Sequence, residues 1–392
     1  MEPFQYCKPT KILFGPGKYD ELGEQVAPLG RTALLVQDAG PLEKLGVFQR
    51  AVNSLEAAGV RAIQLPGVLP NAHLSKIDEG IAICKREKVE VVVGIGGGST
   101  IDSAKAIALG AVYDGDVWDF YSGAAKPAGA LKIGAVTTIS GTGSETDGST
   151  IVSNDRSGND PAKWNVFSPH AYPAFAIMDP ELHVSVPRHL TAAGMADAIA
   201  HACEAYMYDF AVQPFMDEYV ELLVRCMIGC SGVLDHLEDV ELRGRVCWLS
   251  SQSIDGLGGI GRRINPFARW PAHAIQTGVG AVTNTRHGDG LAVLLPACFL
   301  QVNEENPIKT KRFALQVFGI EQRPGMSDKD VGREGILALR AMYERWGLAT
   351  TLKGLGVKKE QLPEIVDNVM AYPGRGLIKR EYVQQVLESC FE

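Results

Sequence analysis

Four residues in the second half of the chain have the types and the spacing of ligands for one metal ion. Asp197 and His201 are four positions apart in GMADAIAHACEAY. Because residues i and i+4 share one face of a helix, both side chains could reach the same cation. His273 lies in RWPAHAIQTG, and His287 follows 14 positions later in NTRHGDGLAVLLP. A histidine in such apolar or glycine-rich sequence favours burial and needs a polar partner, which a metal supplies.

The first pair alone is weak evidence, because helices often carry an aspartate and a histidine at this spacing by accident. The two further histidines make a shared metal site the better hypothesis. One carboxylate with three imidazoles suits Fe²⁺, Zn²⁺, Mn²⁺ or Co²⁺, so ligand type leaves the metal's identity open. The remaining histidines lie mostly near prolines or charges, and we interpret them as loop or surface residues: His73, His170, His183, His189 and His236.

A glycine-rich turn in the first half predicts a phosphate site. The run VEVVVGIG ends at Gly96 and is followed by Gly97, Gly98 and Ser99, where a helix is predicted to begin. Glycines let the backbone approach a phosphate, and a helix N-terminus offers unpaired N–H groups and the positive end of the helix dipole. The spacing G-x-G-x-x-S only approaches the dinucleotide fingerprint. The alternative is a tight strand–helix turn without a ligand.

A second polar turn, TTISGTGSE, follows the next predicted strand and contains Thr137, Thr138, Thr142 and Ser144. Its hydroxyls suit a nucleotide or the rim of a cleft. The alternative is ordinary Ser/Thr turn chemistry in a surface loop. Two such turns after adjacent strands favour the nucleotide, because ligands of open α/β sheets bind at the C-terminal ends of the strands.

Asp38 closes the predicted strand TALLVQ. A carboxylate there could accept hydrogen bonds from a ribose and would repel a 2′-phosphate, which favours NAD over NADP. The usual acidic residue follows the glycine motif, whereas Asp38 precedes it, so the layout is not the standard dinucleotide order. The alternative is a capping or turn aspartate.

The elements that must position these residues change character along the chain. Strands are predicted at 12–15, 32–37, 60–65, 89–96, 131–137 and 174–178, alternating with helices such as 75–88, for which Ser75 is the expected N-cap. This alternation implies a parallel sheet with helices on its faces. From about Thr191 onward, apolar residues recur at helical spacing. We therefore predict an α/β dinucleotide-binding domain with a Rossmann-like parallel sheet at 1–184, and an all-α metal-binding and catalytic domain at 185–392.

Length and composition agree with two globular domains. The chain has 392 residues, more than one hydrophobic core ordinarily holds. Of these residues, 46% are hydrophobic and 21% are charged, which is ordinary for a globular protein. Its net charge of −8 argues against nucleic-acid binding. No stretch approaches the roughly 20 apolar residues of a membrane span, and the N-terminus has no apolar signal core. The eight cysteines include no CxxC pair, so we expect free, mostly buried thiols in a reducing cytoplasm.

With these segments collected, the chain resembles the iron-activated (group III) alcohol dehydrogenase family from about residue 8 to the C-terminus. The motifs that carry the resemblance are GGGSTIDSAK (96–105), SGTGSE (140–145), the MDP segment at 178–190, AAGMADAIAH (192–201) and HGDGLAVLLP (287–296). The resemblance implies a dehydroquinate synthase-like architecture and hydride transfer between NAD and a small alcohol or aldehyde. It also implies a homodimer or larger homo-oligomer.

The resemblance carries over to individual residues. It implies metal ligation by the four residues described first, with Fe²⁺ as the first choice and Zn²⁺ or Mn²⁺ as alternatives. It implies nucleotide contacts at Asp38, Gly97, Gly98, Ser99, Thr138, Thr142 and, as the match to a lysine after the second turn, Lys163. Asp102 and Lys105 match the glycine–helix motif, and Asp102 is either structural or faces the cofactor.

The chain departs from the family pattern near the last two predicted ligands. Thr277 stands where many members have a further histidine, which puts a proton relay there in doubt, and Arg286 stands where many have proline. Before His273, the chain is unusually basic, and Trp270 resembles the butanol dehydrogenase-like branch.

These basic residues suggest a substrate contact. One or more of Arg262, Arg263, Arg269 and Arg286 could hold the anionic group of a short aldehyde, such as sulfoacetaldehyde or phosphonoacetaldehyde, because a guanidinium is a planar fork suited to such groups. The alternative is a solvated basic loop or an oligomer contact.

Three other functions stay open from the sequence. Polyol oxidation as in glycerol dehydrogenase is one, although the four-ligand pattern argues against it. A dehydroquinate synthase-like cyclase also pairs NAD with a metal, but the helical half shows no resemblance to it. A non-catalytic nucleotide-binding protein is disfavoured by four potential ligands. Consumption of NADH with an aldehyde separates the redox function from all three.

Overall fold

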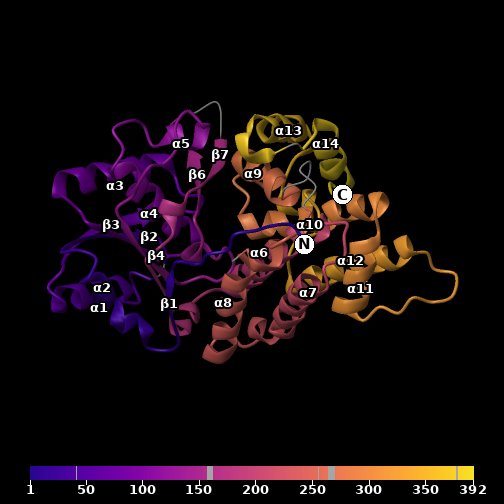
Figure 1. Ribbon diagram of the computed structural model, residues 1–392, viewed down its shortest axis with the longest axis horizontal. Coiled ribbons are helices and arrows are strands. Elements are labelled where there is room, and N and C mark those ends of the chain that lie inside the picture. The colour runs from indigo at the N-terminus through magenta and orange to yellow at the C-terminus, as the bar shows by residue number, and fades with distance from the viewer. Residues whose placement is uncertain (41, 157–161, 255, 264–269, 377) are drawn as a thin grey trace. The chain divides into compact units, whose positions relative to one another are not determined.

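The computed structural model describes residues 1–40, 42–156, 162–254, 256–263, 270–376 and 378–392, and they form two compact units (Figure 1). The helical unit comprises Met1–Tyr6, Pro187–Asp235 and Gln252–Glu392, and the α/β unit comprises Cys7–Val186 and His236–Ser251. Residues 1–6, 185–186 and 236–251 therefore group differently from what a single cut at 184/185 would give.

A six-stranded sheet forms the centre of the α/β unit. Its strands are β1 (Lys11–Phe14), β2 (Thr32–Asp38), β3 (Arg61–Val68), β4 (Val91–Gly96), β5 (Lys132–Thr137) and β8 (Phe175–Met178). They lie in the order β1-β8-β5-β4-β2-β3. Every neighbouring pair is parallel, so the predicted parallel sheet is confirmed.

Helices cover both faces of this sheet, which explains its apolar central strands. Leu34 and Val36 of β2 share a core with α3 (Leu74–Glu87) and α4 (Gly98–Ala111). Ala33 and Leu35 instead pack with α1 (Leu22–Val26) and α2 (Val47–Ala57). Successive strand side chains point to opposite faces, and a strand covered on both faces is an uninterrupted apolar run. The fully buried β4, VVVGIG, is such a run.

The α/β unit also contains an antiparallel hairpin that the sequence analysis missed. β6 (Ser149–Asn154) pairs with β7 (Ala162–Phe167) as a separate two-stranded sheet. Its strands, STIVSN and AKWNVF, mix polar and apolar residues and lack the continuous apolar runs of the main sheet. Trp164 stacks on Trp118 of α5 (Trp118–Ser122), with ring centroids 5.1 Å apart. The start predicted for α3 was also wrong, because its N-cap is His73, while Ser75 bonds to Asp155.

The helical unit is built from long helices. They are α6 (Arg188–Met207), α7 (Pro214–Gly229), α9 (Pro271–Thr283), α10 (His287–Glu305), α11 (Ile308–Phe318), α12 (Asp328–Trp346), α13 (Leu362–Ala371) and α14 (Arg380–Ser389), while α8 (Val240–Ile254) has residues in both units. Several start at recognisable signals: α7 and α9 have proline in the first turn, and Ser327 forms a capping box before α12.

α6 is buried without interruption from Met195 to Met207. Its many alanines let neighbouring helices approach closely, and α10 uses glycine for the same purpose. A Cβ at Gly288 would lie 2.2 Å from the carbonyl oxygen of Ala193, so no larger residue fits there without a shift. This close packing places His287, the residue before Gly288, next to the middle of α6.

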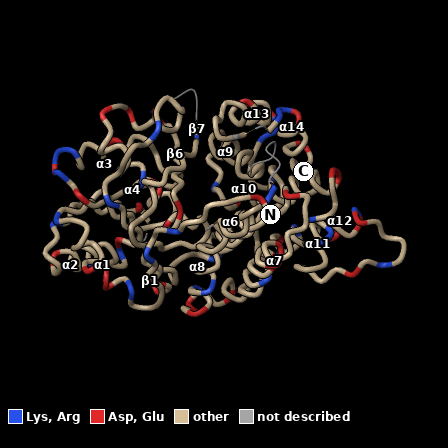
Figure 2. Tube along the Cα trace, in the orientation of Figure 1, with Lys and Arg blue, Asp and Glu red and all other residues tan. Residues whose placement is uncertain are grey.

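Basic and acidic residues are interspersed along the described chain (Figure 2), in agreement with its moderate net charge of −8. Among the described residues, no helix is long and apolar enough to cross a membrane.

Candidate active site

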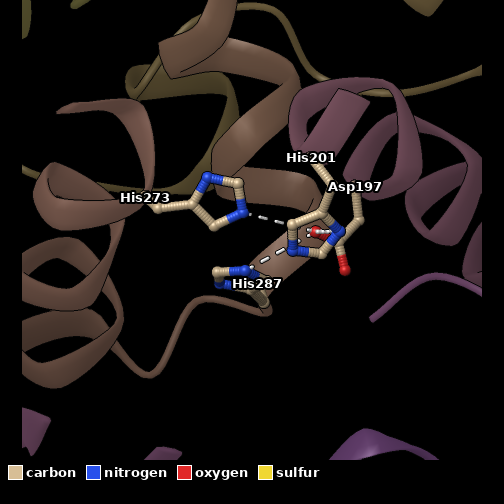
Figure 3. A group of neighbouring side chains, drawn as sticks. All are labelled: Asp197, His201, His273 and His287. Atoms are coloured by element: carbon tan, nitrogen blue, oxygen red, sulfur yellow. Dashed lines mark ion pairs between the residues drawn. The ribbon is translucent and has the colours of Figure 1, made fainter. Parts of the chain in front are cut away.

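Four polar side chains from three helices of the helical unit converge on one point (Figure 3). α6 supplies Asp197 and His201, α9 supplies His273, and His287 is the first residue of α10. Each offers one oxygen or nitrogen atom, and these four atoms all lie within 4.8 Å of one another. The i, i+4 spacing on α6 thus does put two of the groups together, and the two distant histidines join them.

The distances inside this group are too long for hydrogen bonds. Oδ1 of Asp197 lies 3.5 Å from Nδ1 of His201, 3.6 Å from Nε2 of His287 and 3.8 Å from Nε2 of His273. Within the described part of the chain, Asp197 Oδ1 and His273 Nε2 are buried and make no hydrogen bond. Buried polar atoms nearly always have a partner. A cation among these atoms would be that partner, and a donor set of one carboxylate oxygen and three imidazole nitrogens fits Fe²⁺, Zn²⁺ or Mn²⁺.

The electrostatics of the group favour a positive charge at its centre. Burial alone would raise the pKa of Asp197, but the charged forms of His201 and His287 outweigh it and hold that pKa well below its usual value. Burial alone would lower the pKa of His273, but the nearby carboxylate of Glu204 outweighs burial and raises it to about 9. Asp197 therefore stays ionised and His273 favours its cationic form, as expected of a site shaped for a cation.

Two side chains that the sequence analysis did not single out hold the histidines from behind. Glu204 contacts Nδ1 of His273 through Oε2 and accepts a hydrogen bond from the backbone N–H of Ala272 at 2.8 Å through Oε1. Oε1 of Gln276 lies 2.5 Å from Nδ1 of His287. Metal-binding histidines commonly donate their other N–H in this way. The available signal for Glu204 was its place one turn after the second ligand, on the same face of α6.

Trp270 packs against the histidine cluster. Its ring centroid lies 5.0 Å from that of His273 and 5.8 Å from that of His201. Its backbone is left-handed, with φ of 52°, a conformation that is strained for a bulky residue and is found most often at functional sites. The buried Thr277 lies one turn after His273 on α9, and its hydroxyl donates to the carbonyl oxygen of Ala274 at 2.7 Å.

The two glycine-bearing turns of the α/β unit pack against each other. They follow β4 and β5, which are neighbours in the sheet. A Cβ at Gly98 would lie 2.6 Å from the side chain of Thr142, so the first residue of α4 must be glycine for the turns to meet. The N–H of Thr138 donates to the carbonyl oxygen of Gly96 at 3.1 Å, and the Thr137 hydroxyl stays within its own turn, donating to Ile139.

Asp102 of α4 fastens the second turn. Its Oδ1 accepts from the Ser144 hydroxyl at 2.6 Å, and its Oδ2 accepts from the N–H of Ile151 at 3.2 Å. Burial raises the pKa of Asp102 to about 6, against the opposing effect of Lys105. The fully buried Lys105 donates to Asp147 at 2.7 Å. Of the two roles left open for Asp102, these contacts favour the structural one.

Asn71, which the sequence analysis also missed, links two predicted nucleotide residues. Its N–H donates to the Ser99 hydroxyl at 3.0 Å, and its Oδ1 accepts from Lys163 Nζ at 3.0 Å. Asn71 has φ of 74°, a left-handed conformation that asparagine tolerates better than most residues. The one local hint was the turn-forming pair Pro70-Asn71.

Asp38 ends β2 and stabilises the turn that follows. Its Oδ1 accepts a hydrogen bond from the N–H of Gly40 at 3.0 Å, and burial raises its pKa above the usual value. The turn role named as the alternative is therefore real. It uses one carboxylate oxygen, so it is compatible with a ribose contact through the other.

Comparison with known proteins identifies the family. The family model of iron-containing alcohol dehydrogenases matches residues 9–180. A second model, for the C-terminal part of the Fe-containing alcohol dehydrogenase family, matches residues 191–391. The chain belongs to the iron-containing alcohol dehydrogenase family.

Individual relatives of this alcohol dehydrogenase support the same family membership. The probable NADH-dependent butanol dehydrogenase 1 of Bacillus subtilis (strain 168) is 34% identical over 99% of this chain and 98% of its own. NADH-dependent butanol dehydrogenase A of Clostridium acetobutylicum is 32% identical over 92% of this chain and 91% of its own. The crystal structure of NADH-dependent butanol dehydrogenase A from Thermotoga maritima matches with a TM-score of 0.93 at 34% identity, covering 100% of this chain and 99% of that one.

This alcohol dehydrogenase is an oxidoreductase that transfers hydride between NAD(H) and alcohols or aldehydes, in a family that contains iron. The predictions of fold class, enzyme class and cofactors are confirmed.

The arginines considered as substrate contacts are differently placed. The guanidinium of Arg262 has no exposed surface and donates to the buried Asp217 at 2.6 Å, so it is committed to the interior of the helical unit. Arg263 is 74% exposed and pairs with Glu2 at 2.6 Å. Arg286 is exposed at the start of α10. Arg269 lies outside the described residues.

One other histidine of this alcohol dehydrogenase is not where we predicted. His183 was interpreted as a loop or surface residue, but it is only 1% exposed. Its Nε2 lies 3.0 Å from the carbonyl oxygen of Thr137, and its Nδ1 lies 3.0 Å from the Ser140 hydroxyl. The interpretation was wrong because proximity to prolines was taken to mean exposure, whereas His183 is packed behind the second turn.

Proposed function

We propose that this alcohol dehydrogenase holds one divalent cation, Fe²⁺ before Zn²⁺ or Mn²⁺, through Asp197, His201, His273 and His287. We propose further that its substrates are short, uncharged aldehydes and their alcohols. The observation that carries the metal proposal is the buried Asp197 Oδ1, which faces three imidazole nitrogens at 3.5 to 3.8 Å without a hydrogen bond. When bound, such a cation supplies Lewis-acid polarisation of the substrate oxygen.

The nucleotide belongs, in this proposal, to the two turns of the α/β unit. The N-terminus of α4 at Gly97 and Gly98 suits a pyrophosphate, because its N–H groups and dipole attract anions. Asp38 suits a ribose hydroxyl and repels a 2′-phosphate, which favours NADH over NADPH. The remaining residues that we assign to nucleotide binding are Gly96, Ser99, Thr137, Thr138, Thr142, Ser144 and Lys163.

The preference for uncharged substrates rests on the surroundings of the cluster. The indole of Trp270 lies against two of the four predicted ligands and offers an apolar surface to an alkyl chain. Arg262 forms a buried ion pair with Asp217, and Arg263 forms an ion pair with Glu2. An anionic aldehyde would therefore depend on Arg269 or Arg286.

The test is NADH oxidation by the Fe²⁺-loaded protein with matched aldehydes: butanal and lactaldehyde against sulfoacetaldehyde and phosphonoacetaldehyde. We expect kcat/KM to be at least about 10-fold higher for butanal than for either anionic aldehyde, which is the size of effect that an apolar contact of one or two carbons produces. NADPH in place of NADH should be the poorer cofactor.

The control is Arg263→Ala, which removes an exposed arginine and should leave the ranking of aldehydes unchanged. A preference for the anionic aldehydes would contradict the proposal and give the basic residues a substrate role. Turnover of polyols but of no aldehyde would favour the alternative function, polyol oxidation as in glycerol dehydrogenase.

The compartment and the assembly are also proposals. Among the described residues no cysteine is in a disulfide, and six of the eight are buried, which supports a reducing, cytoplasmic location. Assembly into a homodimer or larger homo-oligomer is supported by the family resemblance.

A further inference from the structure

The buried carboxylate of Glu204, which contacts one proposed metal ligand from behind, also contacts the backbone of the same helix. The side chain of Glu204 has 0% exposure. Burying a carboxylate is costly unless its oxygens find partners. Here both do, and both partners belong to the first turn of α9: Oε1 accepts from the N–H of Ala272 at 2.8 Å, and Oε2 contacts Nδ1 of His273.

The placement of Glu204 follows from the helix period. Asp197, His201 and Glu204 occupy positions i, i+4 and i+7 of α6, which form one stripe of the helix. The N-cap residue of α9, Trp270, makes no side-chain capping bond. Glu204 supplies the missing acceptor, and its negative charge suits the positive end of a helix dipole. One side chain of α6 therefore both fastens the start of α9 and contacts the histidine that α9 presents.

The contact determines what His273 can offer to a metal. A carboxylate oxygen accepts hydrogen bonds, so the hydrogen of the neutral ring lies on Nδ1, and Nε2 keeps its lone pair. Nε2 is the atom that lies 3.8 Å from Oδ1 of Asp197 and has no hydrogen bond within the described chain. The ring is thus turned with its donor nitrogen towards the cluster.

We propose that Glu204 is a positioning residue for the metal: it fixes the tautomer and orientation of His273 and provides a second negative charge, beside Asp197, to balance a divalent cation. This inference rests on the proposed metal site. His287 has a neutral partner instead, because its Nδ1 lies 2.5 Å from the amide oxygen of Gln276. The two histidines are held in the same manner by groups of different charge, and His273 is the ligand that gains the anionic partner.

The experiment measures metal binding and not only turnover. Metal-free wild type and Glu204→Gln are titrated with Zn²⁺ against a chromophoric chelator, and the visible spectrum of each Co²⁺-loaded protein is recorded. Glutamine has the same size but carries no charge and has one acceptor oxygen for two donors. We expect the Kd for Zn²⁺ to rise about 10- to 100-fold, as is usual when the partner of a ligand histidine is lost, and the Co²⁺ bands to shift.

Glu221→Gln is the matched control. Glu221 is also buried, at 1% exposure, and its partners are Arg312 at 2.5 Å and the Tyr206 hydroxyl at 3.0 Å rather than a ligand histidine. The same chemical change there should lower stability and leave the Zn²⁺ affinity and the Co²⁺ spectrum unchanged.

The outcomes separate the two proposals. If wild type itself binds neither Zn²⁺ nor Co²⁺, the metal site is wrong, and this inference falls with it. If wild type binds but Glu204→Gln has the same Kd and the same Co²⁺ spectrum, the positioning role alone is overturned, even where the unfolding temperature drops. Should Glu204→Gln fail to fold, Glu204→Asp keeps the charge but withdraws it from His273. Weaker Zn²⁺ binding by that variant supports the proposal, and wild-type affinity overturns it.

Discussion

Two aspartates of the helical unit, Asp197 and Asp217, are equally buried and differ in what faces them. Asp217 accepts hydrogen bonds from Lys309 at 2.7 Å on both carboxylate oxygens, and one of these oxygens also accepts from Arg262 at 2.6 Å. Oδ1 of Asp197 faces imidazole nitrogens alone and, among the described residues, makes no hydrogen bond. The chain thus supplies its own cations at Asp217 and leaves room for an external one at Asp197.

The comparison shows that burial and charge by themselves do not mark a functional site. Both regions contain a desolvated carboxylate on a helix, and both are tight clusters of charged groups. The Asp217 cluster, made of Asp209, Asp217, Arg262 and Lys309, has two carboxylates for two cations, so it can hold the fold together without a ligand. The four-residue cluster around Asp197 is chemically incomplete, and that incompleteness is what points to a cation.

The largest effect should come from removing a ligand from the incomplete cluster. We expect His273→Ala to bind metal more weakly and to lose turnover, because it removes one of the four donors and leaves the buried Glu204 carboxylate without its ring partner. Metal content by elemental analysis and NADH oxidation with butanal measure both losses. His236→Ala, which changes an exposed histidine beside Glu238, is the control. Full metal content and full activity in His273→Ala would remove the basis of the comparison.

At Asp217 we expect a substitution to lower stability and to leave metal binding unchanged. Asp217→Asn leaves Lys309 and Arg262 buried without their charged partner, which costs about 3–5 kcal/mol of unfolding free energy. We expect the lower end of this range, because Arg262 also lies 3.6 Å from the carboxylate of Asp209. Urea unfolding measures the loss, and Zn²⁺ titration of the folded variant should give the wild-type Kd. Lost metal affinity with retained stability would place Asp217 in the site.

The sequence was a good guide wherever a pattern is local. The run VVVGIG predicted the buried β4, and the four-residue spacing of Asp197 and His201 predicted their common face on α6. The pairing of β6 with β7 was missed because the two strands alternate weakly between polar and apolar residues. Such pairings depend on tertiary contacts that no single stretch of sequence records.

Local sequence patterns could not predict the partners of the site residues. Nothing in the segment around Arg262 indicates that its charge is used by Asp217, which is 45 positions away, so the sequence suggested a substrate contact instead. Glu204 and Asn71 were missed for a related reason. Each acts by linking two segments that are distant in the chain, and only the folded structure shows both ends of the link.

The smallest predicted effect is the pH dependence of stability that Asp217 contributes, and it tests the contrast between Asp217 and Asp197. Burial alone would raise the pKa of Asp217, but Lys309 and Arg262 outweigh it and lower that pKa below its usual value of 3.8. A carboxyl whose pKa is lower in the folded than in the unfolded protein stabilises the fold above the unfolded pKa, and this contribution disappears as pH falls through the folded value. Wild type should therefore lose unfolding free energy below about pH 4 more steeply than Asp217→Asn, by at most about 1.4 kcal/mol per pH unit for one proton. Both proteins are compared with a chelator present, so that metal release at low pH contributes to neither curve. Parallel curves would mean that Asp217 is not held ionised by its two cations, and the contrast with Asp197 would then rest on geometry alone.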